Sequence, residues 1–211
     1  MIETLKLNIE RDTGAYRSNG QRLVSVTEAL SIAGLVDFSG INQEILDTAS
    51  ERGRLVHAWT AAYDLVSTDS VKEAIFDSAP TEVMTPYIDA FMQFRRDCDY
   101  IPMLVEHSMA SSRWGVAGTL DRYCRINGML CVVDLKTGAA VQDWVGLQLA
   151  GYEILLKDTQ HIDDHIKRYS LRLGGDGKYN LKEWRSYTDR HDFLAAARVA
   201  RWLIQRKRVE L

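Results

Sequence analysis

Residues 115–138, GVAGTLDRYCRINGMLCVVDLKTG, contain two apolar runs separated by the pair Asn127-Gly128. An Asn-Gly pair between apolar runs is the strongest short-range signal for a β-hairpin, because both residues of a type I′ turn need positive φ. If the loop consists of these two residues, Ile126 pairs with Met129. This register fixes every other pair along the two strands, so the hairpin determines what stands opposite each side chain.

The predicted register brings two acids together near the open end of the hairpin. Asp121 stands opposite Asp134, with Cβ atoms about 5 Å apart on one face of the sheet. Lys136 leaves its strand on the same face as Asp134, with Thr119 as its predicted partner. Two facing carboxylates repel each other, so a shared proton or a cation is expected between them.

The chemistry of this group of residues favours a metal-dependent hydrolase. Two carboxylates offer the hard oxygen ligands that suit Mg²⁺ or Mn²⁺. Lys136 beside them can orient a water molecule or stabilise a developing oxyanion. Together they predict metal-assisted hydrolysis of a phosphodiester. A purely structural alternative remains open on spacing alone: an ion pair of Lys136 with Asp134 at a strand end, with Asp121 merely exposed.

Composition predicts one domain over residues 1–211. The chain has 211 residues, 46% of them hydrophobic, which is enough for a full core. The sequence contains no run of about eighteen apolar residues, so no membrane span is expected. The acidic N-terminus lacks the apolar stretch of a signal peptide. We therefore expect a cytoplasmic protein without a membrane partner. Three cysteines without CxxC spacing argue against an iron–sulfur cluster held by four cysteines.

The charge is distributed unevenly along the chain. Residues 161–211 carry 12 Lys and Arg against 7 Asp and Glu, whereas the whole protein has a net charge of -3. A basic C-terminal quarter on an acidic body favours a polyanion as a partner on one side. A solvated helix face explains the same charges.

Periodicity and turn signals predict helices and strands on both sides of the hairpin. Their order predicts an α/β (α+β) fold with a central mixed sheet flanked by helices. In chain order the predicted elements are a hairpin within residues 1–24, a helix opened by the capping box Ser25-Val26-Thr27-Glu28 and closed near Gly34, a helix over 42–67, a helix over 86–99, a strand over 101–108, the central hairpin, a helix over 144–157, a hairpin of 169–173 with 179–187, and a helix over 189–208.

Four short motifs in this order resemble the PD-(D/E)XK nuclease superfamily, and its RecB-like and lambda-exonuclease-like branch in particular. Many members of that branch are phage-encoded, and the resemblance implies a restriction-endonuclease-like core. The similarity runs from about Ser25 to Tyr152. The motifs are Arg52-Gly53-Arg54-Leu55-Val56-His57, Gly118-Thr119-Leu120-Asp121, Asp134-Leu135-Lys136-Thr137-Gly138 and Gln148-Leu149-Ala150-Gly151-Tyr152.

Carried onto this sequence, the resemblance implies the parts of an active site. Asp121 and Asp134 bind one or two Mg²⁺ or Mn²⁺ ions together with the backbone carbonyl of Leu135. Lys136 is the catalytic lysine. His57 is a further ligand, typical of the branch that uses Mn²⁺ as well as Mg²⁺. The alternative for His57 is a helix histidine with satisfied hydrogen bonds and no ligand role.

Further residues are candidates for the same site. Glu106 matches an auxiliary acid for a second ion, although an exposed strand residue is the alternative. Gln148 and Tyr152 lie one helical turn apart and, by the resemblance, face the active site and the DNA. A polar edge on an amphipathic helix explains this pair equally. Arg52 and Arg113 are candidates for phosphate contacts.

Two departures from the superfamily pattern limit the assignment. Leu120 replaces the proline that gives the superfamily its name, and Asp134 stands where many members have Glu. The cysteines of the iron–sulfur subgroup are missing.

Three functions remain open on the sequence. The leading one is a Mg²⁺- or Mn²⁺-dependent deoxyribonuclease, most simply an exonuclease in DNA recombination, repair or phage DNA processing. A single-strand or flap endonuclease on DNA or RNA would use the same active site. A catalytically inactive nucleic-acid-binding module is the third. The resemblance also suggests DNA, a single-strand annealing protein and further copies of the chain as partners.

Overall fold

The computed structural model describes residues 7–9, 15–18, 20–37, 40–68, 71–72, 75 and 81–206. The strands are β1 (Leu7–Ile9), β2 (Tyr16–Ser18), β3 (Gln21–Ser25), β4 (Tyr100–Ser111), β5 (Val116–Ile126), β6 (Met129–Lys136), β7 (Lys167–Leu173) and β8 (Tyr179–Glu183). The helices are α1 (Val26–Ile32), α2 (Gln43–Leu65), α4 (Thr81–Asp97), α5 (Trp144–Gln160) and α6 (Asp189–Gln205). The predicted turn at Gly14 and the last residues of the predicted final helix lie outside the described residues.

The sheet is mixed, which confirms the predicted α/β fold with a central mixed sheet. Its strands follow the order β1-β2-β3-β5-β6-β7-β8, and β4 pairs with β5. The β3–β5 and β6–β7 pairs are parallel, and all other pairs are antiparallel.

One edge of β5 is shared by two strands. β4 pairs with β5 over its whole length, from Val116 to Ile126. The other edge pairs with β3 at residues 116–117 and with β6 at residues 122–126. A strand has only two edges, so β3 and β6 must follow each other along the same one. The backbone between them, residues 118–121, has no strand partner on that side among the described residues.

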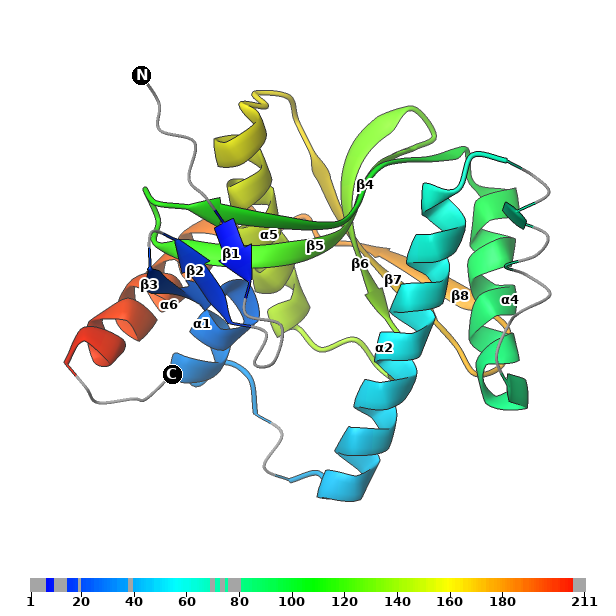
Figure 1. Ribbon diagram of the computed structural model, residues 1–211, viewed down its shortest axis with the longest axis horizontal. Helices are drawn as coiled ribbons and strands as arrows, with labels where there is room; N and C mark the ends of the chain where they lie inside the picture. Colours follow the sequence, from blue (N-terminus) through cyan, green and yellow to red (C-terminus); the bar gives the residue numbers. More distant parts are fainter. Residues whose placement is uncertain are drawn as a thin grey trace.

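Helices cover both faces of the sheet (Figure 1). Helices α1, α5 and α6 share one apolar cluster with the sheet, and α2 and α4 share the other. β6 is buried on both faces: Val132 belongs to the first cluster, and Val133 belongs to the second. This follows from the two-residue period of a strand, and it explains why β6 is a nearly continuous apolar run. Among the described residues no helix has the length and apolar character needed to span a membrane.

The Asn127-Gly128 hairpin is confirmed. Both residues have positive φ, +50° for Asn127 and +78° for Gly128, as a type I′ turn requires. The predicted register holds from Ile126 opposite Met129 to Arg122 opposite Val133. The paired ladder ends there, one position before the two acids.

Two helix starts show where local signals succeed and fail. Ser25 caps α1 by accepting a hydrogen bond from the Glu28 N–H, and the Glu28 side chain accepts one from the Ser25 N–H, so the predicted capping box is confirmed. The predicted start of a helix at Pro86 is wrong, because α4 begins at Thr81 and contains Pro86. A proline so near the start removes only one backbone hydrogen bond, so the helix extends through it.

The contact of α5 with α1 and α6 depends on a glycine. A Cβ added at Gly151 would lie 2.8 Å from ring carbons of Phe193 and 2.9 Å from Val26 Cγ1. We expect Gly151→Ala to lower the free energy of unfolding by about 1–3 kcal/mol through overpacking, measured by urea denaturation. Gly53→Ala is the control, since its Cβ would meet Thr137 Oγ1 at an ordinary 3.6 Å. Equal stability of Gly151→Ala and the wild type would contradict this packing.

Candidate active site

A large cavity lies where the pairing of β5 and β6 ends. It has a volume of about 1240 Å³ and lies between α2, the segment 137–142 and α5. The predicted site residues that line it are Arg52, His57, Asp121, Asp134, Leu135, Lys136, Gln148 and Tyr152. The structure thus brings together eight of the ten predicted site residues around one space. Glu106 adjoins them through His57, and Arg113 lies elsewhere.

Residues 118–121 of β5, which pair with neither β3 nor β6, form a gap in the sheet that accounts for the position of Asp121. At this point β6 no longer pairs with β5, so within the part of the chain that the structure describes its backbone N–H groups have no strand partner on that side. Asp121 Oδ2 accepts a hydrogen bond of 2.6 Å from the Leu135 N–H. A side-chain carboxylate therefore takes the place of a backbone carbonyl in the ladder, and this holds Asp121 against β6.

The predicted pairing of Lys136 with Thr119 is wrong. The Thr119 hydroxyl forms hydrogen bonds with the hydroxyls of Ser108, at 2.7 Å, and Tyr16, at 2.9 Å. Because the β5–β6 ladder ends at Arg122, the register that predicted this partner does not reach Thr119.

Three side chains from three elements form a group with metal-ligand character. His57 comes from α2, Glu106 from β4 and Asp121 from β5. One ligand atom of each lies within 4.8 Å of the other two. His57 Nδ1 is 3.5 Å from Asp121 Oδ1 and 3.6 Å from Glu106 Oε1, and its Nε2 lies 3.1 Å from the Leu135 carbonyl oxygen.

The backbone of β4 is distorted at Glu106. Val105 and His107 pair with Arg122 and Leu120, but Glu106 makes no pair with the strand between them. Its φ is +45°, in the left-handed region that a side chain other than glycine adopts at a cost of about 1–2 kcal/mol. Such strain occurs often at functional sites. Here it accompanies the placement of the Glu106 carboxylate beside His57.

The two carboxylates of this group dominate the electrostatics around His57. Burial disfavours the imidazolium, but the carboxylates of Asp121 and Glu106 outweigh it and raise the pKa of His57 to about 11. Burial likewise disfavours the charged form of Asp121, yet His57 and Lys136 lower the pKa of Asp121 below its ordinary value. The acids therefore hold a proton on His57, at a place where a divalent cation could supply the positive charge instead.

Asp134 lies deeper and faces Lys136. Its Oδ2 is 2.6 Å from Lys136 Nζ, and its side chain is 3% exposed. Burial raises the pKa of Asp134 to about 6, although Lys136 opposes the shift. Among the described residues Lys136 is the only partner of this buried oxygen.

A chain of polar side chains from α5 holds Lys136. Gln148 Oε1 accepts a hydrogen bond of 3.1 Å from Lys136 Nζ. Gln148 Nε2 donates to Thr27 Oγ1, at 3.1 Å, and to the hydroxyl of Tyr152, at 3.2 Å. The sequence indicated Gln148 and Tyr152 but assigned Thr27 only to the start of a helix. Its role needs the start of α1 to lie against α5, which no local signal predicts.

Arg52 and Trp144 complete the walls of the cavity. Arg52 donates to the Thr137 carbonyl at 3.3 Å, and its guanidinium carbon lies 5.3 Å from the ring centroid of Tyr87. Lys136 Nζ lies 5.6 Å from the ring centroid of Trp144. Both residues line the space around the acids and the lysine.

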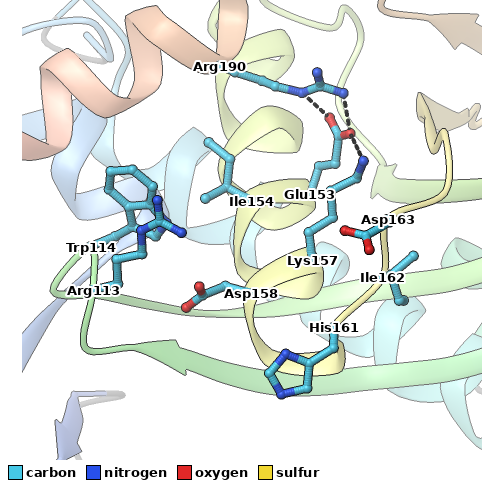
Figure 2. A pocket seen from close by; sticks show the side chains of 10 residues that line it. All are labelled: Arg113, Trp114, Glu153, Ile154, Lys157, Asp158, His161, Ile162, Asp163 and Arg190. Atoms are coloured by element: carbon cyan, nitrogen blue, oxygen red, sulfur yellow. Dashed lines mark hydrogen bonds and ion pairs between the residues drawn. The ribbon is translucent and has the colours of Figure 1, made fainter.

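The structure places Arg113 outside this site. It lies in the turn between β4 and β5, with its guanidinium 4.8 Å from the centroid of the Trp114 ring. Both residues line a second cavity of about 530 Å³ (Figure 2). There Glu153 already contacts Arg190 and Lys157.

The charges of the second cavity are balanced. Besides these paired groups it contains Arg113, His161, Asp158 and Asp163. The three acids Glu153, Asp158 and Asp163 offset the three basic side chains Arg113, Lys157 and Arg190, so this cavity offers little net attraction for a phosphate. The placement gives no support to a phosphate contact by Arg113 near the acids of β5 and β6.

The residues present fit a divalent cation. Carboxylates, an imidazole and a backbone carbonyl are the donors that Mg²⁺ and Mn²⁺ accept. His57, Glu106 and Asp121 are close enough to share one ion, and Asp134, paired with Lys136, lines the same cavity. The three-residue group contains two of the predicted ligands, His57 and Asp121, together with Glu106, and Asp134 is not part of it.

The fold is similar to that of a solved structure. The chain matches a crystal structure of a candidate exonuclease from Eubacterium rectale with a TM-score of 0.51 and 13% sequence identity. The match covers 89% of this chain and 76% of that protein. At this identity the likeness concerns the fold alone, and it agrees with a nuclease-like core. No family model and no curated protein sequence matches the chain.

Proposed function

We propose that this protein is a Mg²⁺- or Mn²⁺-dependent deoxyribonuclease that hydrolyses phosphodiester bonds from DNA ends. The observation that carries the proposal is the convergence of His57, Glu106, Asp121 and Asp134 with Lys136 at the gap in the sheet. A structural ion pair would need one acid for one lysine. The pair of Lys136 with Asp134 meets that need and leaves the approach of His57, Glu106 and Asp121 to one another unexplained.

Each residue has a role that follows from its position. His57, Glu106, Asp121 and the Leu135 carbonyl would hold the cation, with Asp134 beside them. A bound divalent cation supplies positive charge at the scissile phosphate and makes the attacking water more acidic. Lys136, 25% exposed, can reach a phosphate oxygen in the cavity and stabilise the charge that develops on it. Gln148 keeps the ammonium of Lys136 directed by its hydrogen bond.

The walls of the cavity favour an unpaired strand next to the acids. Ile45, Leu46 and Ala49 of α2 face this space, as do Val141 and Trp144 on its other side. An aromatic side chain such as Trp144 stacks on an exposed base and the apolar side chains can contact it, whereas a duplex keeps its bases paired inside. This feature also supports a second candidate function, a single-strand or flap endonuclease with the same active site.

Degradation of defined DNA substrates tests the proposal. Linear duplex, linear single-stranded and circular single-stranded DNA are incubated with the purified protein in Mg²⁺, in Mn²⁺ or in EDTA. We expect both linear substrates to be shortened from their ends in either metal, the circle to survive, and EDTA to abolish cleavage until Mn²⁺ is restored in excess. Cleavage of the circle would favour the endonuclease. Metal-independent binding without cleavage of any substrate would contradict hydrolysis and favour a binding module.

A further inference from the structure

A fully buried arginine lies next to Asp121 in β5. The side chain of Arg122 is 1% exposed, and its fork has partners on three elements. Nη1 donates to Glu106 Oε1 at 3.1 Å and to the Asp121 carbonyl at 2.7 Å, and Nη2 donates to Thr60 Oγ1 at 3.0 Å. A buried charge is tolerated only when it is paired and hydrogen-bonded, so this orientation is well defined.

The partners of Arg122 include every member of the metal-ligand group, directly or through one residue. It bonds Glu106 by the side chain and Asp121 by the backbone. Thr60, its third partner, donates to the His57 carbonyl at 3.1 Å, one turn earlier on α2. A single guanidinium therefore connects β4, β5 and α2 at the place where their ligand side chains meet.

Asp64, a buried acid on α2, holds the Arg122 side chain through its Nε. Arg122 Nε donates to Asp64 Oδ2 at 2.7 Å, and the side chain of Asp64 is 0% exposed. Asp64 also accepts hydrogen bonds from Tyr100 and Arg95. The guanidinium is thus held from one side by Asp64 and faces the ligand group with the other.

We infer that Arg122 is a positioning residue: it holds the Glu106 carboxylate, through Oε1, in the orientation in which it completes the cation site with His57 and Asp121. The inference rests on the proposed function, because it presumes that these three residues bind a divalent cation. The Arg122 guanidinium also supplies a positive charge between the carboxylates of Asp64 and Glu106, which would otherwise repel each other. Lysine cannot replace it, because one ammonium group does not have the planar fork that reaches partners on three elements.

Metal binding, measured without any substrate, tests the inference. Mn²⁺ is titrated by calorimetry into protein freed of metal with EDTA, for the wild type, Arg122→Lys, Glu106→Gln and the double variant. We expect Arg122→Lys to weaken Mn²⁺ binding by about 10-fold, in the range typical of residues that orient metal ligands. In the Glu106→Gln background the same change should have little further effect, since Arg122 acts through Glu106.

Arg95→Lys is the matched control, because Arg95 also bonds Asp64 but contacts none of the three ligands. It should leave Mn²⁺ affinity within about twofold of the wild type. Thr60→Val, of similar size, gives an independent answer if Arg122→Lys does not fold: it should weaken Mn²⁺ binding about threefold, through the lost link to His57. Thermal unfolding of each variant identifies the folded ones.

The outcomes separate this inference from the function on which it rests. Wild-type affinity in Arg122→Lys would overturn the inference, as would the same loss in Arg95→Lys. The inference would also be overturned if Arg122→Lys weakened Mn²⁺ binding by the same factor in the Glu106→Gln background as in the wild type. Absence of Mn²⁺ binding by the wild type would instead refute the proposed metal-dependent function itself.

Discussion

Lys136→Ala is expected to reduce DNA cleavage at least about a hundredfold while the protein remains folded and still binds Mn²⁺. Lys136 Nζ is the one cation that contacts Asp134 among the described residues, and it lies in the cavity with a quarter of its side chain exposed. Loss of a preorganised positive charge removes transition-state stabilisation but no metal ligand. The measurement is the rate of release of labelled nucleotides under single-turnover conditions, beside calorimetry with Mn²⁺.

A second lysine over a tryptophan provides the matched control. Lys182 Nζ lies 3.7 Å from the ring centroid of Trp184, whereas Lys136 Nζ lies 5.6 Å from that of Trp144. Lys182 is 45% exposed and does not line the cavity. Lys182→Ala should cleave at the wild-type rate. Cleavage by Lys136→Ala at the wild-type rate would contradict the assigned role or indicate a contaminating nuclease.

Asp134→Asn is expected to abolish cleavage and, in EDTA, to make the protein more stable. Burial raises the pKa of Asp134 to about 6, so its ionised form destabilises the fold at any pH above that value. Removing the charge should increase the free energy of unfolding at pH 8 by about 1–3 kcal/mol, or several degrees in Tm. The gain should shrink as the pH falls through 6 towards 4, because the wild-type carboxyl then takes up a proton. Thermal unfolding in EDTA across pH 4–8 measures it.

Asp121→Asn is the matched comparison, with the opposite expected sign. The pKa of Asp121 is lowered in the fold, so its ionised form stabilises the metal-free protein above its ordinary pKa. The variant should lose cleavage as well, but with a lower Tm in EDTA at pH 8. If Asp134→Asn lowered the Tm as much as Asp121→Asn, this would contradict the claim that the ionised Asp134 carboxylate destabilises the fold.

The central hairpin shows how far a local pattern reaches. Two residues, Asn127 and Gly128, were enough to predict the turn, the register of ten paired residues and the approach of Asp121 to β6. The register failed at Asp121 itself, because the ladder ends at Arg122. Local sequence specifies how a hairpin starts. Where it ends depends on the strands and helices packed around it.

The rest of the site depends on contacts between distant segments. β3 pairs with β5 across roughly ninety residues, and nothing in either strand predicts that parallel pair. Thr27 joins the site only because α1 follows β3. Arg122 carries no sequence signal of burial, because its burial depends on Thr60 and Asp64 of α2 packed against it. Buried charges of this kind carry no periodic signal, so sequence patterns do not detect them.

The sharing of one β5 edge by β3 and β6 affects when the cavity can form during folding. β3 is made early in synthesis, β5 and β6 much later, and α5 later still, yet the cavity needs all of them. Pairing across long chain separations is slow to form, because loop closure costs entropy before any contact compensates it. A partly synthesised chain would have neither the gap between β3 and β6 nor the support of Gln148 for Lys136. The proposed cutting site would therefore form among the last events of folding, once all of these elements have packed together.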